Sequence, residues 1–303
     1  MPSLDAYIPN PALAERYVPR EIGTEGILDI DLYEATIFDG TMATLLTGPT
    51  GSGKTEGIRA VCAKHGIPMY IVQGSGGTTK EEFSGAPVVN SDPSDPRPFV
   101  NNPGPLVKMM LGHDAGQGYD VDSQYEHTVF VLDEINVVPP KQLLWLNSIN
   151  DSRRTLSLNE EQGTPVITAH RGFSFFGTMN EGHQYAGTKD LNPAVRNRFN
   201  EFQVGYSHEA ENTILADIPW LLAVRDKLRA AMEHHQVESL ISTRALVTLR
   251  DNIATYSNRF GEDKAVEIAI SAFVNNCLPD DREVILQIVT AERGGGRGFQ
   301  QTV

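Results

Sequence analysis

The sequence predicts an α/β fold in which a parallel sheet lies between helices, followed by a small all-helical domain. Two observations lead to this fold class. Apolar runs of strand length recur, separated by helical or loop-rich stretches, at residues 42–47, 68–73, 128–132, 173–178 and 201–204. Strands that alternate with helical segments favour a parallel sheet covered on both faces. From residue 209 onward the apolar residues repeat with helical periodicity, and no further strand signal follows.

Length and composition are those of an ordinary globular protein. The chain has 303 residues, of which 40% are hydrophobic and 21% charged, enough for one large or two ordinary domains. No apolar stretch approaches the ~18 residues that a membrane-spanning helix requires, so we expect no membrane association. The first residues carry Asp5 and lack the continuous apolar segment of a secretory signal. We therefore expect a cytoplasmic protein.

Charge and cysteine content disfavour other classes. Lysine and arginine number 25 against 39 acidic residues, for a net charge of -14. This balance repels a phosphate backbone unless the basic groups gather on one face, so a nucleic-acid partner is disfavoured. Cys62 and Cys277 are the only cysteines and have no metal-ligand spacing. We expect both to be reduced and buried.

A glycine-rich loop follows the first predicted strand and precedes a helix-like stretch that ends near His65. Its spacing, G-x-x-x-x-G-K-T in a strand, loop and helix context, indicates a phosphate-binding P-loop. The glycines let backbone amides turn toward phosphate oxygens, and the helix directs its positive dipole end at them. We therefore predict an ATP site formed by Gly48, Pro49, Thr50, Gly51, Ser52, Gly53, Lys54, Thr55 and Glu56.

Two residues of this loop carry specific chemistry. Lys54 would reach the β and γ phosphates, and the hydroxyl of Thr55 would ligate Mg²⁺. The alternative is a glycine-rich turn without a ligand. It leaves a lysine and a threonine at these offsets with no packing reason to be there.

The apolar run in the stretch TVFVLDEIN ends in two adjacent carboxylates, Asp133 and Glu134. Mg²⁺ prefers oxygen ligands and keeps several waters, so Asp133 at the end of a neighbouring strand could hold it through that shell. Glu134 would point elsewhere and act as the base for the water that attacks the γ phosphate, which suits hydrolysis better than transfer to an acceptor. The alternative is that both acids begin the next helix and complement its dipole.

Residues 74–105 are rich in glycine and proline and cannot form one regular element. Within them, TTKEEF is expected as a helical turn capped by Thr78 or Thr79. PLVKMMLG is expected as a short helix that begins at Pro105 and ends before Gly112. Insertions of this length in compact domains are usually functional or disordered.

The composition divides the chain into four parts. An N-terminal extension (1–40) leads into an α/β core (41–207), which is followed by a helical lid domain (208–293) and a mobile tail (294–303). The tail is rich in glycine, as is typical of frayed termini.

Several stretches together resemble AAA+ ATPases of the MoxR and dynein-related branch. They are the P-loop GPTGSGKT, the run VFVLDEIN, the segments DSRRTLSL and STRAL, and the block ITAHRGFSFFGTMNEGHQYAGTKDLNPAVRNRF. The sequence looks most like the CbbQ, NirQ and NorQ group, with GvpN and the MoxR ATPases as wider relatives. The resemblance covers residues 20 to 292 and implies an AAA+ P-loop domain followed by a helical lid.

The resemblance also implies roles for residues beyond the P-loop. Asn180 matches the sensor 1 position and could hydrogen-bond the attacking water or the γ phosphate; a turn asparagine is the alternative. Arg198, in RNRF, matches the arginine finger that reaches the nucleotide of a neighbouring subunit. Arg196 lies two residues away and is equally basic, so only the family pattern favours Arg198 over it.

Arg244, in STRAL, matches the sensor 2 position. Ser242 or Thr243 would cap a lid helix and direct the arginine at the phosphates. An arginine in a first helical turn slightly opposes the helix dipole, unless an anion is bound there. Arg153 and Arg154 also match the family, and three contacts stay open for them: a subunit interface, a partner or only the nearby Asp151. By analogy alone, the adenine contacts are expected in residues 17–22.

The histidines and tryptophans suggest no further site. His170, His183, His234 and His235 do not provide three residues with ligand spacing, so we expect no metal among them. Trp145 and Trp220 lie in helical apolar patterns and are expected in the core rather than as binding platforms.

The resemblance implies an ATP-hydrolysing ring that remodels or activates a client protein. Members of the group assemble mainly as hexamers and act with a partner that carries a von Willebrand factor A domain, so we expect both features here. Residues 74–120 are the expected partner-facing or pore-facing surface.

The sequence leaves three other functions open. The main one is a nucleic-acid motor or loader, possibly phage-encoded. It is disfavoured because residues 74–120 contain three basic and six acidic residues, which offer no electrostatic funnel to a strand. A nucleotide-gated scaffold is disfavoured by Glu134. A P-loop small-molecule kinase explains neither RNRF nor STRAL.

Overall fold

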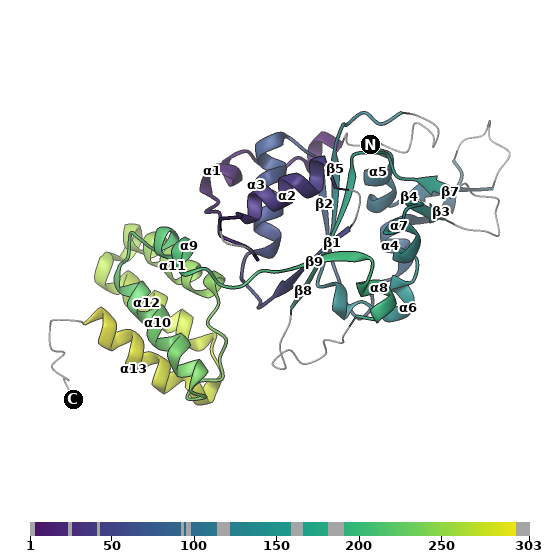
Figure 1. Cartoon of the computed structure of the whole chain (residues 1–303). Coiled ribbons are helices and arrows are strands. Elements are labelled where there is room, and N and C mark those ends of the chain that lie inside the picture. The colour runs from purple at the N-terminus through teal and green to yellow at the C-terminus, as the bar shows by residue number, and fades with distance from the viewer. Residues whose placement is uncertain are drawn as a thin grey trace. The chain divides into compact units, whose positions relative to one another are not determined.

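The computed structural model describes residues 4–23, 26–40, 43–91, 94, 98–113, 122–158, 166–180 and 191–294 (Figure 1). The chain forms two compact units. The first contains Met1–Gly48 and Lys54–Val204, and the second contains Pro49–Gly53 and Gly205–Val303. Each unit has its own apolar core.

The centre of the first unit is a five-stranded parallel sheet, with strand order β2-β5-β8-β1-β9. The strands are β1 (Ala43–Gly48), β2 (Met69–Gln73), β5 (Thr128–Asp133), β8 (Phe173–Asn180) and β9 (Phe199–Gln203). All five correspond to predicted strands, and the predicted fold class is confirmed. In the register of the sheet Gly48 lies opposite Asn180, so the P-loop begins at the same edge of the sheet at which Asn180 ends β8.

Alternation along the strands divides the core into two layers. Leu45, Phe130 and Leu132 face one layer, whereas their neighbours Leu46 and Val131 face the other. Figure 1 shows helices on both faces. One face is covered by α1 (Ala12–Arg16), α2 (Asp29–Phe38) and α3 (Lys54–His65), and the other by α4 (Lys80–Ser84), α5 (Pro105–Leu111), α6 (Pro140–Leu143), α7 (Leu146–Ile149) and α8 (Pro193–Arg196). Short 3-10 turns form at η1 (Leu4–Tyr7) and η3 (Ile135–Val137).

Two small antiparallel pairs were not predicted. β3 (Gly85–Val89) pairs with β4 (Phe99–Pro103), and β6 (Thr155–Ser157) pairs with β7 (Val166–Thr168). The helices α4 and α5 lie where the sequence placed them, and Gly112 ends α5 in the left-handed conformation that favours glycine. The cap of α4 was predicted in its position, but its expected side-chain bond is absent. Thr79 occupies the cap position without a side-chain cap bond, whereas the hydroxyl of Thr78 accepts from the amide of Ser75 at 2.9 Å.

The second unit is helical, as predicted. It contains α9 (His208–Ile214), α10 (Trp220–Glu233), α11 (Thr243–Phe260), α12 (Glu262–Asn275) and α13 (Arg282–Arg293), with a 3-10 turn, η5 (Pro279–Asp281). Leucine, isoleucine, valine and phenylalanine side chains from these helices form one apolar cluster. α9 and α10 are separate helices, since the chain turns before Pro219. Most of the expected tail lies outside the described residues.

The burial of the cysteines and tryptophans was partly predicted. Both cysteines are free. Cys62 is fully buried, but Cys277 is only partly buried, because it follows the end of α12. Trp145 and Trp220 are partly buried and pack against the cores of their units. Among the described helices, none is both long and apolar enough to cross a membrane.

Candidate active site

The glycine-rich loop runs from the end of β1 to the start of α3. Three of its glycines have positive φ angles: 141° at Gly48, 65° at Gly51 and 87° at Gly53. These conformations strain any residue that carries a Cβ. At Gly48 a Cβ would in addition collide with the carbonyl oxygen of Val204. The glycines of the local sequence therefore permit the backbone path of this loop.

The side chain of Lys54 connects the start of this loop to the end of β8. Its ammonium group donates to the carbonyl oxygen of Gly48 at 3.0 Å and to the side-chain oxygen of Asn180 at 2.9 Å. The side chain is almost entirely buried, since only 7% of the residue is exposed. A buried ammonium group with oxygen partners can interact strongly with phosphate oxygens, because water screens it little.

Thr55 and Asp133 meet at the carboxyl end of β5. The hydroxyl of Thr55 donates to Oδ1 of Asp133 at 3.0 Å. A hydroxyl and a carboxylate oxygen in contact beside a phosphate-binding loop fit the oxygen ligands that Mg²⁺ takes while keeping several waters. These two residues would therefore hold the ion.

Thr178 also lies at the candidate site, although the sequence did not predict it there. Its hydroxyl donates to the same oxygen of Asp133 and accepts from the backbone amide of Glu134 at 3.1 Å. It is buried in β8, two positions before Asn180, so the side chains of Thr178 and Asn180 lie on the same face of the strand. A single hydroxyl thus fixes the positions of both carboxylate residues.

Glu134 adopts a left-handed backbone conformation, with φ 55° and ψ 47°. This conformation is uncommon for residues other than glycine and is found at sites where strain serves a function. The turn separates the side chain of Glu134 from that of Asp133, and one oxygen of Glu134 accepts from the amide of Asn180 at 3.2 Å. Glu134 makes no side-chain cap bond to the turn that follows it. The structure therefore brings Lys54, Thr55, Asp133, Glu134 and Asn180 together.

Arg196 and Arg198 differ in their partners. Arg196 forms a forked ion pair with Glu201, with Nε at 2.7 Å from one carboxylate oxygen. Arg198 donates to the carbonyl oxygen of Ala194. The pKa of Asp151 is lowered, mainly by hydrogen bonds from Arg153 and to a smaller extent by the charge of Arg198. Arg198 can leave a carbonyl more easily than Arg196 can leave a carboxylate.

Arg153 and Arg154 have separate local roles. Arg153 pairs with Asp151 at 2.6 Å on the surface. Arg154 is half-buried and donates to the carbonyl oxygen of Phe173, and burial lowers its pKa.

Arg244 lies in the second unit at the start of α11, and its side chain is exposed. Ser242 caps this helix by accepting from the amide of Ala245 at 3.2 Å. Gly51, in the loop segment of the same unit, lies against this helix start. A Cβ on Gly51 would be 2.8 Å from the side chain of Ser242 and 3.1 Å from Cβ of Arg244.

The segment suggested for adenine contacts carries a buried polar network. Asp29 is fully buried and accepts from the hydroxyl of Tyr17 and from Nε of Arg20, the latter at 3.0 Å. Burial, opposed in part by Arg20, raises the pKa of Tyr17. The ring of Tyr17 and that of Tyr33 lie against Gly57 of α3. This network connects the N-terminal segment to the helix that follows the P-loop.

The histidines form no metal site in the described part of the chain. His170 lies 2.7 Å from the hydroxyl of Thr128, and burial, with the nearby charge of Arg154, lowers its pKa to about 4. His234 and His235 are exposed at the end of α10, and His183 lies outside the described residues.

A parallel sheet with a P-loop at its carboxyl edge, and an adjacent carboxylate pair, define the class of P-loop nucleotide-binding proteins. Comparison with known families specifies the class further, because residues 43–199 match the AAA domain of the dynein-related subfamily. The chain belongs to this family. The dynein-related subfamily fits the MoxR-like branch of AAA+ proteins that the sequence resembles.

Two relatives from staphylococci resemble most of the chain. A protein of Staphylococcus haemolyticus is 30% identical over 262 residues, which cover 82% of this chain and 88% of the relative. A protein of Staphylococcus aureus is 30% identical over 259 residues, with the same coverage of 82% and 88%. Both are described as uncharacterised.

Proposed function

We propose that this protein is an ATP-hydrolysing subunit of an AAA+ ring that remodels or activates a client protein. Membership of the AAA family implies nucleotide binding and ATPase activity in general. The observation that carries the proposal is the side chain of Asn180, which contacts Lys54 with its oxygen and Glu134 with its nitrogen. A phosphate-binding cation and a base are thereby joined through one amide.

Each residue has a distinct part in hydrolysis. Lys54 and the loop amides bind the phosphates, and Thr55 with Asp133 would hold Mg²⁺, which would neutralise charge on the phosphates. Glu134 takes the proton of the attacking water, and Asn180 orients that water against the γ phosphate. Thr178 keeps Asp133 and the backbone of Glu134 in place.

Two arginines complete the proposed mechanism. Arg198 reaches the nucleotide of a neighbouring subunit and offsets charge that develops in the transition state. Its weaker local partner, a carbonyl oxygen, favours it over Arg196, whose guanidinium pairs with Glu201. Arg244, beside the loop glycine Gly51, contacts the phosphates as sensor 2. The shared site requires a ring, and the resemblance to CbbQ, NirQ and NorQ proteins supports a hexamer.

We further propose that the ring acts on its client together with a partner protein. The resemblance to this group supports a partner with a von Willebrand factor A domain. The β3–β4 pair supports a protein-facing surface within residues 74–120, because it exposes apolar side chains at Val88 (42%), Val89 (74%) and Phe99 (50%). Exposed apolar residues gathered on one hairpin are typical of protein contact sites.

Phosphate release from ATP tests the catalytic proposal. We expect Lys54→Ala to lose nucleotide binding, because its ammonium group is the cation of the loop. Glu134→Gln should bind ATP and turn it over at least about 100-fold more slowly, since the base is lost. Glu15 is an exposed glutamate of α1, so Glu15→Gln makes the same chemical change away from the site and serves as the matched control. Wild-type turnover by the Glu134→Gln protein would instead indicate a nucleotide-gated scaffold.

A pull-down tests the partner proposal separately. The Glu134→Gln protein, loaded with ATP, serves as bait, and the Val89→Ser, Phe99→Ser variant of it serves as the comparison. We expect the bait to retain a protein partner and the variant to lose it. Recovery of no protein, with ATP turnover intact in the wild type, contradicts the client proposal. Salt-sensitive DNA binding that stimulates turnover would favour a nucleic-acid motor.

A further inference from the structure

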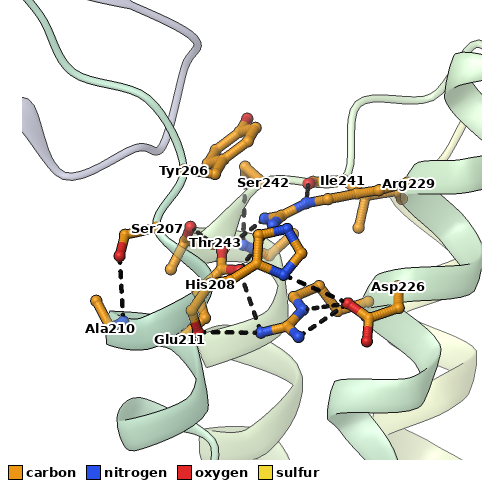
Figure 2. A network of polar contacts seen from close by, with 12 residues as sticks. Tyr206, Ser207, His208, Ala210, Glu211, Asp226, Arg229, Ile241, Ser242 and Thr243 are labelled. Carbon is orange, nitrogen blue, oxygen red and sulfur yellow. Dashed lines mark hydrogen bonds and ion pairs between the residues drawn. The ribbon is translucent and has the colours of Figure 1, made fainter. Parts of the chain in front are cut away.

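The second unit encloses a carboxylate, that of Glu211 in α9. The residue is only 1% exposed, and a buried carboxylate is unfavourable unless charged or hydrogen-bonding groups surround it. Two guanidinium groups from α10 do so. Arg229 donates to the two carboxylate oxygens at 2.5 and 2.6 Å (Figure 2). Arg225 lies 3.6 Å from one of them.

A further partner of this carboxylate comes from α11. The hydroxyl of Thr243 donates to Glu211, and Nε of Arg229 donates to the carbonyl oxygen of Ile241 at 3.5 Å. Between these two contacts lies Ser242, which caps α11. Three consecutive residues that lead directly into Arg244 are thus held in place.

Arg229 also connects this network to the glycine-rich loop segment of the same unit. Its guanidinium carbon lies 4.3 Å from the centre of the Tyr206 ring, at a distance typical of cation–π contacts. The hydroxyl of Tyr206 donates to the carbonyl oxygen of Thr50 at 2.9 Å. The same arginine therefore contacts the carboxylate that holds α11 and the tyrosine that holds the loop.

Stability alone is a weak explanation for such a network. The cost of removing buried charges from water offsets most of their attraction, and apolar replacements are often equally stable. Forked arginine–carboxylate pairs do, however, fix the orientation of the two side chains relative to each other. The network contributes a defined orientation to the first turn of α11.

We propose that Glu211 and Thr243 are positioning residues for Arg244. Glu211, held by Arg229, binds the Thr243 hydroxyl and so fixes the helix turn from which the Arg244 side chain leaves. This inference rests on the proposed contact of Arg244 with the nucleotide. The position of its guanidinium then depends on a carboxylate that does not itself touch the phosphates.

Thr243→Val tests the inference, because it removes the hydroxyl and keeps the shape of the side chain. We expect ATP turnover to fall about tenfold, as for loss of a hydrogen bond to a charged group, and Thr243→Ser to restore it to within about twofold. Thr290→Val is the matched control, since the Thr290 hydroxyl donates to carbonyl oxygens of its own helix, α13; its turnover should equal that of the wild type. Glu211→Gln should reproduce the loss while far-ultraviolet circular dichroism shows a folded protein.

Combination with Arg244→Ala separates positioning from structure. If Thr243 acts through Arg244, the Thr243→Val, Arg244→Ala protein should turn over ATP no more slowly than Arg244→Ala alone. Losses that multiply, or a Thr243→Val protein with wild-type turnover, overturn the inference. Wild-type turnover and ATP affinity in Arg244→Ala alone would instead overturn the proposed role of Arg244.

Discussion

The ammonium group of Lys54 lies 2.9 Å from the side-chain oxygen of Asn180, although the two residues are 126 positions apart in the sequence. The amide nitrogen of the same asparagine is 3.2 Å from Glu134. Asn180 thus stands between the cation that would bind phosphate and the carboxylate that would activate water. Its position at the end of β8, next to the strands that carry the P-loop and Asp133, follows from the strand order of the sheet.

Replacement of Asn180 by alanine should slow hydrolysis more than it weakens binding. Removal of one donor at a site of developing charge typically costs about 100-fold to 1000-fold in kcat. Lys54 and the loop amides remain, so the affinity for ATP should change by less than about tenfold. Steady-state turnover with titration of a fluorescent ATP analogue measures both. Equal loss of kcat and affinity contradicts the assignment.

Thr178→Val should reduce turnover, because it removes the hydroxyl shared by Asp133 and the amide of Glu134. We expect a loss of about tenfold or more, with Thr178→Ser close to the wild type. Thr44 is also buried in a strand of this sheet, but it lies near the start of β1, whereas the candidate site lies at the end of that strand. Thr44→Val is therefore the control. If Thr178→Val and Thr44→Val are equally active, Thr178 has no role in catalysis.

Gly57→Ala in α3 should destabilise the protein, although alanine is the better helix former by about 1 kcal/mol. A Cβ at this position would lie 2.5 Å from a ring carbon of Tyr33 and 2.8 Å from the hydroxyl of Tyr17. Tyr33 is fully buried and Tyr17 is tied to Asp29, so neither can move freely. Overpacking of this kind typically costs about 1 to 3 kcal/mol.

Urea unfolding of the Gly57→Ala protein measures this cost. Gly76→Ala, where a Cβ would meet open space, is the control and should leave the free energy of unfolding nearly unchanged. A Gly57→Ala protein more stable than the wild type would mean that the tyrosines adjust at little cost.

The free energy of unfolding should fall as pH is lowered from about 6.5 to about 4. Burial, with smaller contributions from Arg154, His127 and His113, lowers the pKa of His170 to about 4, whereas an unfolded histidine titrates near 6.5. Between these values the unfolded chain binds a proton that the folded chain does not, so acid favours unfolding. Above pH 6.5 this contribution is constant.

His170→Gln tests the pH dependence, because glutamine is polar and does not titrate. Its free energy of unfolding should depend less steeply on pH than that of the wild type between pH 4 and 6.5, on the order of 1 kcal/mol or more across the window. Parallel curves for the two proteins would show that His170 does not cause the acid sensitivity.

Much of the fold was predictable because buried parallel strands are continuous apolar runs, a signal that a sequence shows directly. The β3–β4 pair was not predictable in the same way. β3 contains Pro87 and β4 contains Asn101 and Asn102, residues that rarely mark strands. Their pairing depends on the partner strand rather than on local preference.

The candidate site, like the fold, was predictable only in part. The P-loop and the Asp133–Glu134 pair have fixed spacings that reflect their chemistry. Thr178 has none, since threonine is common in strands and its role depends on Asp133, which ends β5, and on Glu134, which follows it. Glu211 resembles a solvated helix residue in the sequence. Its burial becomes visible only when α10 supplies Arg225 and Arg229.

In the proposed ring, each ATP site combines Glu134 of one subunit with Arg198 of its neighbour. The most direct measurement is ATP turnover of Glu134→Gln and Arg198→Ala proteins, each alone and then mixed and allowed to reassemble. Each should be nearly inactive alone, and the mixture should regain a sizeable fraction of wild-type turnover, because some interfaces then combine intact residues from different chains. A mixture that stays inactive, although sizing shows mixed oligomers, contradicts the shared site.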